Sequence, residues 1–128
     1  MISLRWELTA SSNIYIGGKN MQKEKIRRIL LGLGIPAHFA GYEYLQTAVM
    51  ECVNDPELKH KVTTALYPKV AKVHNTTSHR VERCIRTALG KVEWDQPQIR
   101  KDFGGAKCTN GHVIARLSEL VGMEEKPE

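Results

Sequence analysis

The residues with the strongest chemical pattern lie between Ser78 and Val92, where apolar side chains recur at helical spacing. With about 100° of rotation per residue, one side of such a helix is apolar. Its members are Val81, Cys84, Ile85, Ala88, Leu89 and Val92. Glu82, Arg83 and Arg86 fall on the other side. An Arg guanidinium can donate to O6 and N7 of guanine together, and a Glu carboxylate can accept from N4 of cytosine. These three residues are therefore predicted to read DNA bases.

Polar residues before and at the start of this helix could bind the phosphates of the DNA backbone. Hydroxyl groups and the free amides of a helix N-terminus can bind phosphate, and Lys and Arg attract it whatever the base sequence. The predicted phosphate-binding residues are Lys69, Lys72, Thr76, Thr77, Ser78, His79 and Arg80, with Lys59 and Lys61 adding charge from the flank. An ordinary amphipathic surface helix is the alternative interpretation, because Glu and Arg at i, i+4 are a common surface pair.

Other patterns that could support chemistry are weaker. Cys108 and His112 have a spacing that suits zinc, but no second pair of ligands accompanies them, so we expect no metal site and no cofactor. Gly17-Gly18-Lys19 resembles the end of a phosphate-binding loop, but Asn13 stands where that motif needs its first glycine. The chain has no nucleophile in an elbow motif and no close pair of carboxylates, so we predict that it is not an enzyme.

The composition favours one globular domain with an anionic partner. The 128 residues are 41% hydrophobic and 26% charged, with a net charge of +5. Residues 56–94 hold eight Lys and Arg against three Asp and Glu, so this segment carries the whole excess. Three widely spaced cysteines, with no membrane span and no signal peptide, predict a soluble protein of the cytoplasm.

The elements that must position these residues are mostly helices. We predict an all-α fold of about six helices with an embedded helix-turn-helix, and the helical ranges are 21–33, 37–53, 56–67, 68–74, 78–92 and 110–121. Asp55, Thr77 and Asn110 are the predicted N-caps, and Gly34 and Gly122 are the predicted stops.

Two segments do not fit a helical period. Residues 95–108 contain a proline and paired glycines, and they are predicted to form a loop or wing with one short helical turn. Ile2–Leu8 alternates apolar and polar residues, and Ile14–Ile16 could pair with it as a short N-terminal β-hairpin. The predicted organisation is an extension at 1–20, a helical domain at 21–122 and an acidic tail at 123–128.

Several short motifs along the chain resemble one family. In chain order they are Ile35-Pro36-Ala37-His38-Phe39, Gly41-Tyr42, Tyr44-Leu45, Asn54-Asp55, Leu66-Tyr67-Pro68, Asn75-Thr76-Thr77, Arg80-Val81-Glu82-Arg83-Cys84-Ile85-Arg86 and Thr109-Asn110. Together they resemble the C-terminal effector domain of sporulation stage zero protein A, a response-regulator transcription factor of endospore-forming bacteria. The resemblance covers roughly residues 22–121.

The resemblance implies an all-helical domain that binds a short, asymmetric promoter element containing G and C. Family members often bind as a homodimer on tandem elements and contact RNA polymerase. The base-reading residues of the family correspond to Glu82, Arg83 and Arg86. Two features depart from the family, since residues 1–20 stand where a phosphorylated receiver domain is usual, and the stretch between Trp94 and Thr109 is shorter.

The prediction is therefore a sequence-specific regulator of transcription that binds double-stranded DNA. The alternative is a protein-interaction module that acts on RNA polymerase or another regulator without reading DNA.

Overall fold

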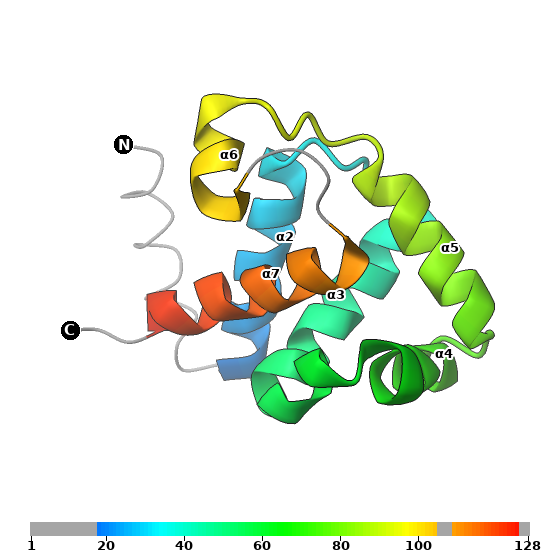
Figure 1. The fold of residues 1–128 in the computed structure, drawn as a ribbon. Helices are drawn as coiled ribbons and strands as arrows, with labels where there is room; N and C mark the ends of the chain where they lie inside the picture. The colour runs from blue at the N-terminus through cyan, green and yellow to red at the C-terminus, as the bar shows by residue number, and fades with distance from the viewer. Residues whose placement is uncertain (1–17, 105–108, 126–128) are drawn as a thin grey trace.

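The fold is known from a computed structural model, which describes residues 18–104 and 109–125 (Figure 1). The six α-helices of these residues are α2 (Gly18–Gly32), α3 (Ala40–Asn54), α4 (Tyr67–Val73), α5 (Ser78–Leu89), α6 (Pro97–Phe103) and α7 (Asn110–Glu125). The described residues contain no strand, so the all-α class is confirmed. The N-terminal extension at 1–20 was predicted to form a β-hairpin. Its residues 1–17 lie outside the described part of the chain, and Gly18 already belongs to α2.

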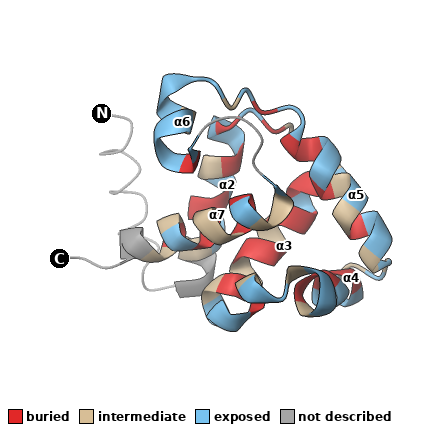
Figure 2. Cartoon of the chain, in the orientation of Figure 1, coloured by how far each residue is buried: buried red, intermediate tan, exposed pale blue. Residues whose placement is uncertain are grey.

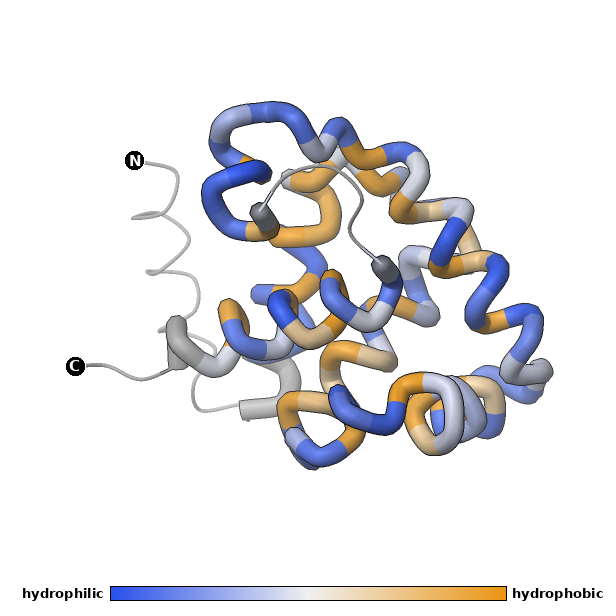
Figure 3. Tube along the Cα trace, viewed as in Figure 1, coloured by the Kyte–Doolittle hydropathy of each residue, from blue (hydrophilic) through white to orange (hydrophobic). Residues whose placement is uncertain are grey.

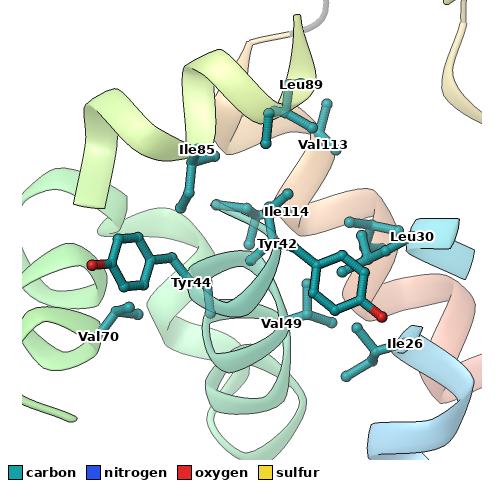
Figure 4. Close-up of a cluster of buried hydrophobic side chains, with 14 of the residues drawn as sticks. Ile26, Leu30, Tyr42, Tyr44, Val49, Val70, Ile85, Leu89, Val113 and Ile114 are labelled. Carbon is teal, nitrogen blue, oxygen red and sulfur yellow. The ribbon is translucent and has the colours of Figure 1, made fainter. Parts of the chain in front are cut away.

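Helix α3 lies at the centre of the core and packs against α2, α4, α5 and α7. Tyr42 and Tyr44 leave α3 in different directions, Tyr42 toward Leu30 of α2 and Tyr44 toward Val70 of α4 (Figure 4). All four side chains are at least nine-tenths buried. Burial of apolar side chains such as these supplies most of the free energy that holds helices together. Helix α5 is thus seated directly on the central helix.

The end of α2 follows the sequence prediction. Gly34 has a φ of +95°, and its N–H donates to the carbonyl oxygen of Leu31 at 3.0 Å. The N–H of Ile35 donates to Leu30 at 3.2 Å, which completes the two-bond motif typical of a helix that ends at a left-handed glycine. Gly34 is confirmed as the stop.

The prediction of a regular α-helix over 56–67 was wrong, although the segment is helical. This segment forms a 3-10 turn, η1 (Pro56–His60), and a π turn, η2 (Val62–Leu66), which leads directly into α4. The oxygen of Asp55 does accept from the N–H of Glu57 at 3.3 Å, so the predicted cap is confirmed. The run of β-branched residues at 62–64 has low helix propensity, which explains why a regular α-helix does not continue.

Other boundaries also differ from the prediction, since α2 begins at Gly18 rather than residue 21 and α3 at Ala40 rather than residue 37. Residues 97–103 form a two-turn helix, because Pro97 begins α6 and Gly104, with a φ of +90°, ends it. Helix α5 ends at Leu89 rather than Val92. Helix α7 continues past Gly122, since this glycine has no positive φ and a glycine without the left-handed turn weakens a helix without stopping it.

Candidate nucleic-acid interface

Helices α4 and α5 form a helix-turn-helix whose turn is held by backbone hydrogen bonds. Asn75 has a φ of +55°, and its N–H donates to the carbonyl oxygen of Lys72 at 3.3 Å. The N–H of Thr76 donates to the oxygen of Ala71 at 2.8 Å. The side chain of Thr77 then accepts from the N–H of Arg80 at 3.1 Å, so the predicted N-cap of α5 is confirmed. This turn determines the direction in which α5 leaves α4.

The two sides of α5 differ as the helical period predicts. Hydrophilic and hydrophobic residues alternate along the helix (Figure 3), and the exposed residues lie away from the other helices (Figure 2). Val81, Ile85 and Ala88 are fully buried. On this side α3 approaches closely, because a Cβ on Gly41 would overlap the carbonyl oxygen of Cys84 and lie 2.8 Å from the Cβ of Ala88.

The three predicted base-reading residues lie on α5 in two different surroundings, Arg83 beside the start of α3 and the other two beside Tyr67 and Asn110. Arg86 forms an ion pair and a hydrogen bond with the Glu82 carboxylate one turn earlier. The Arg86 side chain is 69% exposed and that of Glu82 is 26% exposed. Arg83 is exposed beside the start of α3, and it makes no ion pair or hydrogen bond within 18–104 and 109–125. Arg83 is thus available to a ligand. Arg86 can contact a ligand only if it breaks its ion pair with Glu82 or keeps Glu82 as a second partner.

The predicted phosphate-binding residues lie around the turn and the first turn of α5. Lys72, Thr77 and His79 are exposed, while Thr76 and Ser78 are partly buried. The ammonium group of Lys69 lies 3.5 Å from the carboxylate of Glu51 on α3. These residues thus belong to α4, to the turn and to the first turn of α5.

Arg80 is a second predicted phosphate contact whose side chain has a partner inside the protein. A side-chain hydrogen bond with Tyr44 raises the pKa of its guanidinium, which remains charged at any relevant pH. Tyr44 belongs to α3, so Arg80 joins the first turn of α5 to the central helix.

A model of the family described as sporulation initiation factor Spo0A C terminal matches residues 26–121. The chain belongs to this family. The matched range begins within α2 and ends within α7, so it includes the whole helix-turn-helix. Membership of the Spo0A C-terminal family confirms the resemblance of the motifs, and it classes the chain as a DNA-binding domain of a transcription factor rather than as a member of an enzyme family.

Two contacts in this Spo0A C-terminal domain were not predicted. The ring of His74 packs edge-on against Tyr44 at 5.0 Å, and its Nε2 lies 2.7 Å from the hydroxyl of Thr47. Both partners belong to α3, so His74 fastens the turn of the helix-turn-helix to the core. The helical spacing of Tyr44 and Thr47 places them on one face, but nothing in the sequence indicates that His74 is their partner.

Asn110 has a different role from the predicted one. The side chain of Thr109, not of Asn110, caps α7 by accepting from the N–H of His112 at 3.1 Å. The Nδ2 of Asn110 instead donates to the hydroxyl of Tyr67 at 3.2 Å and to the carbonyl oxygen of Glu82 at 3.3 Å. Burial raises the pKa of Tyr67, although the Asn110 hydrogen bond and the charge of Arg86 act in the opposite direction.

The described part of the chain has neither a metal-binding cluster nor a membrane-spanning helix. It contains no group of three or more His, Cys, Asp or Glu side chains that could hold a metal ion. Cys108 lies outside the described residues, and the Nε2 of His112 lies 3.2 Å from the carbonyl oxygen of Phe103. Among the same residues, no helix combines the length and apolar character needed to cross a bilayer.

Proposed function

We propose that this protein regulates transcription by binding a short promoter element in double-stranded DNA, with α5 in the major groove. The observation that carries the proposal is the polar face of α5, where Arg83 and Arg86 are exposed and Glu82 is partly exposed, on a helix capped by Thr77. In a helix-turn-helix the second helix enters the major groove with its N-terminal part against the bases. The domain assigned to this task is residues 21–122.

The contacts that Arg83, Arg86 and Glu82 make within the protein indicate the role of each residue in base recognition. Arg83 has no competing partner among the described residues, so its planar fork can bond O6 and N7 of a guanine directly. Arg86 is held by Glu82, which orders its guanidinium before binding and reduces the entropy lost on contact. The Glu82 carboxylate can then accept from a cytosine, and it repels phosphate when the bases do not match.

The backbone contacts are assigned to the turn and to the start of α5. Thr77, Ser78 and the first backbone amides of α5 offer hydrogen-bond donors to one phosphate. His79 and Arg80 follow directly in the chain and are assigned to phosphate as well. Lys72, Lys69 and Thr76 extend the contact along α4 and the turn. These contacts position the helix, while specificity comes from the three base-reading residues.

Further partners are proposed from the family alone. They are RNA polymerase and, on tandem elements, a second copy of the chain. An interaction module that does not read DNA is the competing function, and the Glu and Arg residues on the outer face of α5 would have no role in it.

The test is selection of bound duplexes from a random-sequence pool, followed by fluorescence anisotropy. We expect a recurring G/C-containing element, and we expect the selected duplex to bind about a thousandfold more tightly than a scrambled duplex of the same composition. Equal affinities for the two duplexes would overturn the proposal. Absence of DNA binding together with binding to purified RNA polymerase would favour the interaction module.

A further inference from the structure

The amide of Asn110 joins three elements at the back of the reading helix. Asn110 is the first residue of α7, Tyr67 is the first residue of α4, and Glu82 lies in the middle of α5. The two hydrogens of the Asn110 amide go to the Tyr67 hydroxyl and to the Glu82 carbonyl oxygen. Since a carbonyl oxygen can only accept, the amide must present its nitrogen to α5.

Asn110 can make these contacts because another residue caps its helix. Thr109 accepts from the N–H of His112 and so satisfies the start of α7. A residue that only stabilised the end of α7 would have no need to reach Glu82, which lies 28 positions earlier in the chain. The Asn110 side chain therefore serves the packing of α5 and not the integrity of α7.

The other contacts of α5 with the core are polar at its two ends, where Arg80 hydrogen-bonds with Tyr44 and the indole N–H of Trp94 donates to the carbonyl oxygen of Leu89 at 3.3 Å. Between these ends the contacts other than that of Asn110 are mostly apolar. Val81, Ile85 and Ala88 bury apolar surface, and the hydrophobic effect is not directional. A hydrogen bond to a backbone oxygen in the middle of the helix is directional, and it resists rotation about the helix axis. The bond is made to Glu82, whose carboxylate holds Arg86.

We infer that Asn110 is a positioning residue for base recognition, which sets the rotation of α5 so that Glu82 and Arg86 meet the edges of the base pairs. The inference rests on the proposed function and adds a residue outside the helix-turn-helix to it. Asn110, Tyr67, Glu82 and Arg86 also line one shallow pocket, so the positioning contact and the reading pair are neighbours.

The experiment compares Asn110→Ala with Thr109→Ala, a control that removes the cap of the same helix and leaves the amide in place. Anisotropy gives the affinity of each protein for the selected duplex and for its scrambled counterpart, and circular dichroism gives the melting temperature. We expect Asn110→Ala to lower the ratio of the two affinities about five- to tenfold, as the loss of one well-placed hydrogen bond allows. Thr109→Ala should lower the melting temperature and keep the ratio.

Asn110→Asp tests the same point in a protein of nearly unchanged shape. A carboxylate suits the N-terminus of α7, so the variant should fold even if Asn110→Ala does not. It cannot donate to the Glu82 carbonyl oxygen, and we expect the ratio of affinities to fall as in Asn110→Ala. Tyr67→Phe removes the other acceptor and should lower the ratio by a smaller factor.

The outcomes separate the inference from the proposed function. If the wild-type protein prefers the selected duplex and Asn110→Asp keeps the full ratio, the inference is refuted and the proposed function stands. If Asn110→Ala and Thr109→Ala lower the ratio equally, Asn110 has only a structural role and the inference is refuted. A wild-type protein without preference would refute both.

Discussion

Arg83 and Arg86 are only three positions apart on α5, yet their side chains make different contacts within the protein. Arg86 is already paired with Glu82, whereas Arg83 has no ion pair in the part of the chain that the structure describes. A contact made by a free side chain is lost completely when that side chain is removed. A contact made by a paired side chain also leaves its former partner without a counter-charge. The substitutions at these positions should therefore have different consequences.

Arg83→Ala should weaken binding to the selected duplex by about 1–3 kcal/mol, because a bidentate contact to guanine is lost. Binding to the scrambled duplex should change much less. Anisotropy titrations of both duplexes at one salt concentration measure the two effects. An equal loss on the two duplexes would mean that Arg83 contacts phosphate rather than a base.

Glu82→Ala should reduce discrimination rather than affinity. The substitution removes a carboxylate that repels phosphate, and it frees Arg86 to bind phosphate anywhere, so the scrambled duplex should bind more tightly. The ratio of the two affinities is the quantity to measure, with Glu57→Ala, an exposed carboxylate on η1, as the control. A uniform loss of binding would show that Glu82 only supports the helix.

Cys52 of α3 gives a prediction about pH. Burial raises the pKa of its thiol from 9.0 to about 11, and the residue is 2% exposed. Between these two pH values the unfolded chain loses the thiol proton while the folded chain keeps it, so the free energy of unfolding falls as the pH rises. The loss should be about 1 kcal/mol near pH 10. Urea titrations near pH 8 and pH 10 should show this difference in the wild type and a smaller one in Cys52→Ala.

At the scale of elements, the close approach of α3 to α5 is possible because residue 41 is a glycine and has no side chain. A Cβ on Gly41 would meet the backbone oxygen of Cys84 and the Cβ of Ala88 at 2.8 Å, and neither atom belongs to a flexible side-chain end. The two helices would have to separate to admit it. The sequence alone shows only a glycine near the start of a helix, a position where glycine is common.

Gly41→Ala should lower the free energy of unfolding by about 1–3 kcal/mol through overpacking. It should also weaken binding to the selected duplex, because α5 would shift on α3. Gly32→Ala at the end of α2 is the matched control, since a Cβ there meets nothing within 4 Å. If urea titration shows that Gly41→Ala is as stable as Gly32→Ala, the helices do not cross as closely as the structure indicates.

At the scale of the whole molecule, the basic residues are divided between internal pairs and free positions. Lys69 pairs with Glu51 and Lys59 lies 3.8 Å from Glu119, so part of their charge is already compensated. Lys72 is exposed and makes no ion pair among the described residues. Only such free charges contribute fully to the counterion release that drives DNA binding.

Lys72→Ala should reduce the slope of log K against log salt by about 1, because one phosphate contact is lost. Its effect should be the same on the selected and the scrambled duplex, since phosphate contacts carry no sequence information. Lys23→Ala, an exposed residue of α2, is the control with unchanged slope. An unchanged slope in Lys72→Ala would place α4 away from the DNA backbone.

The sequence by itself was sufficient for the fold class and the family. It also predicted the amphipathic character of α5, the cap at Thr77 and the stop at Gly34. These features depend on residues within about one or two helical turns of one another, so periodicity and capping chemistry reveal them. The family model matches residues 26–121, a range that contains α4, the turn and α5.

Only the tertiary structure decided which side chains meet across the chain. The contacts of Asn110 with Glu82 and of His74 with Thr47 join residues 28 and 27 positions apart, and no local pattern indicates either pair. The type of helix at 56–66 and the role of Thr109 as the cap of α7 also needed the structure. The physical reason is that local sequence determines which face of a helix is apolar. The partner that a polar side chain finds depends on how all the helices pack.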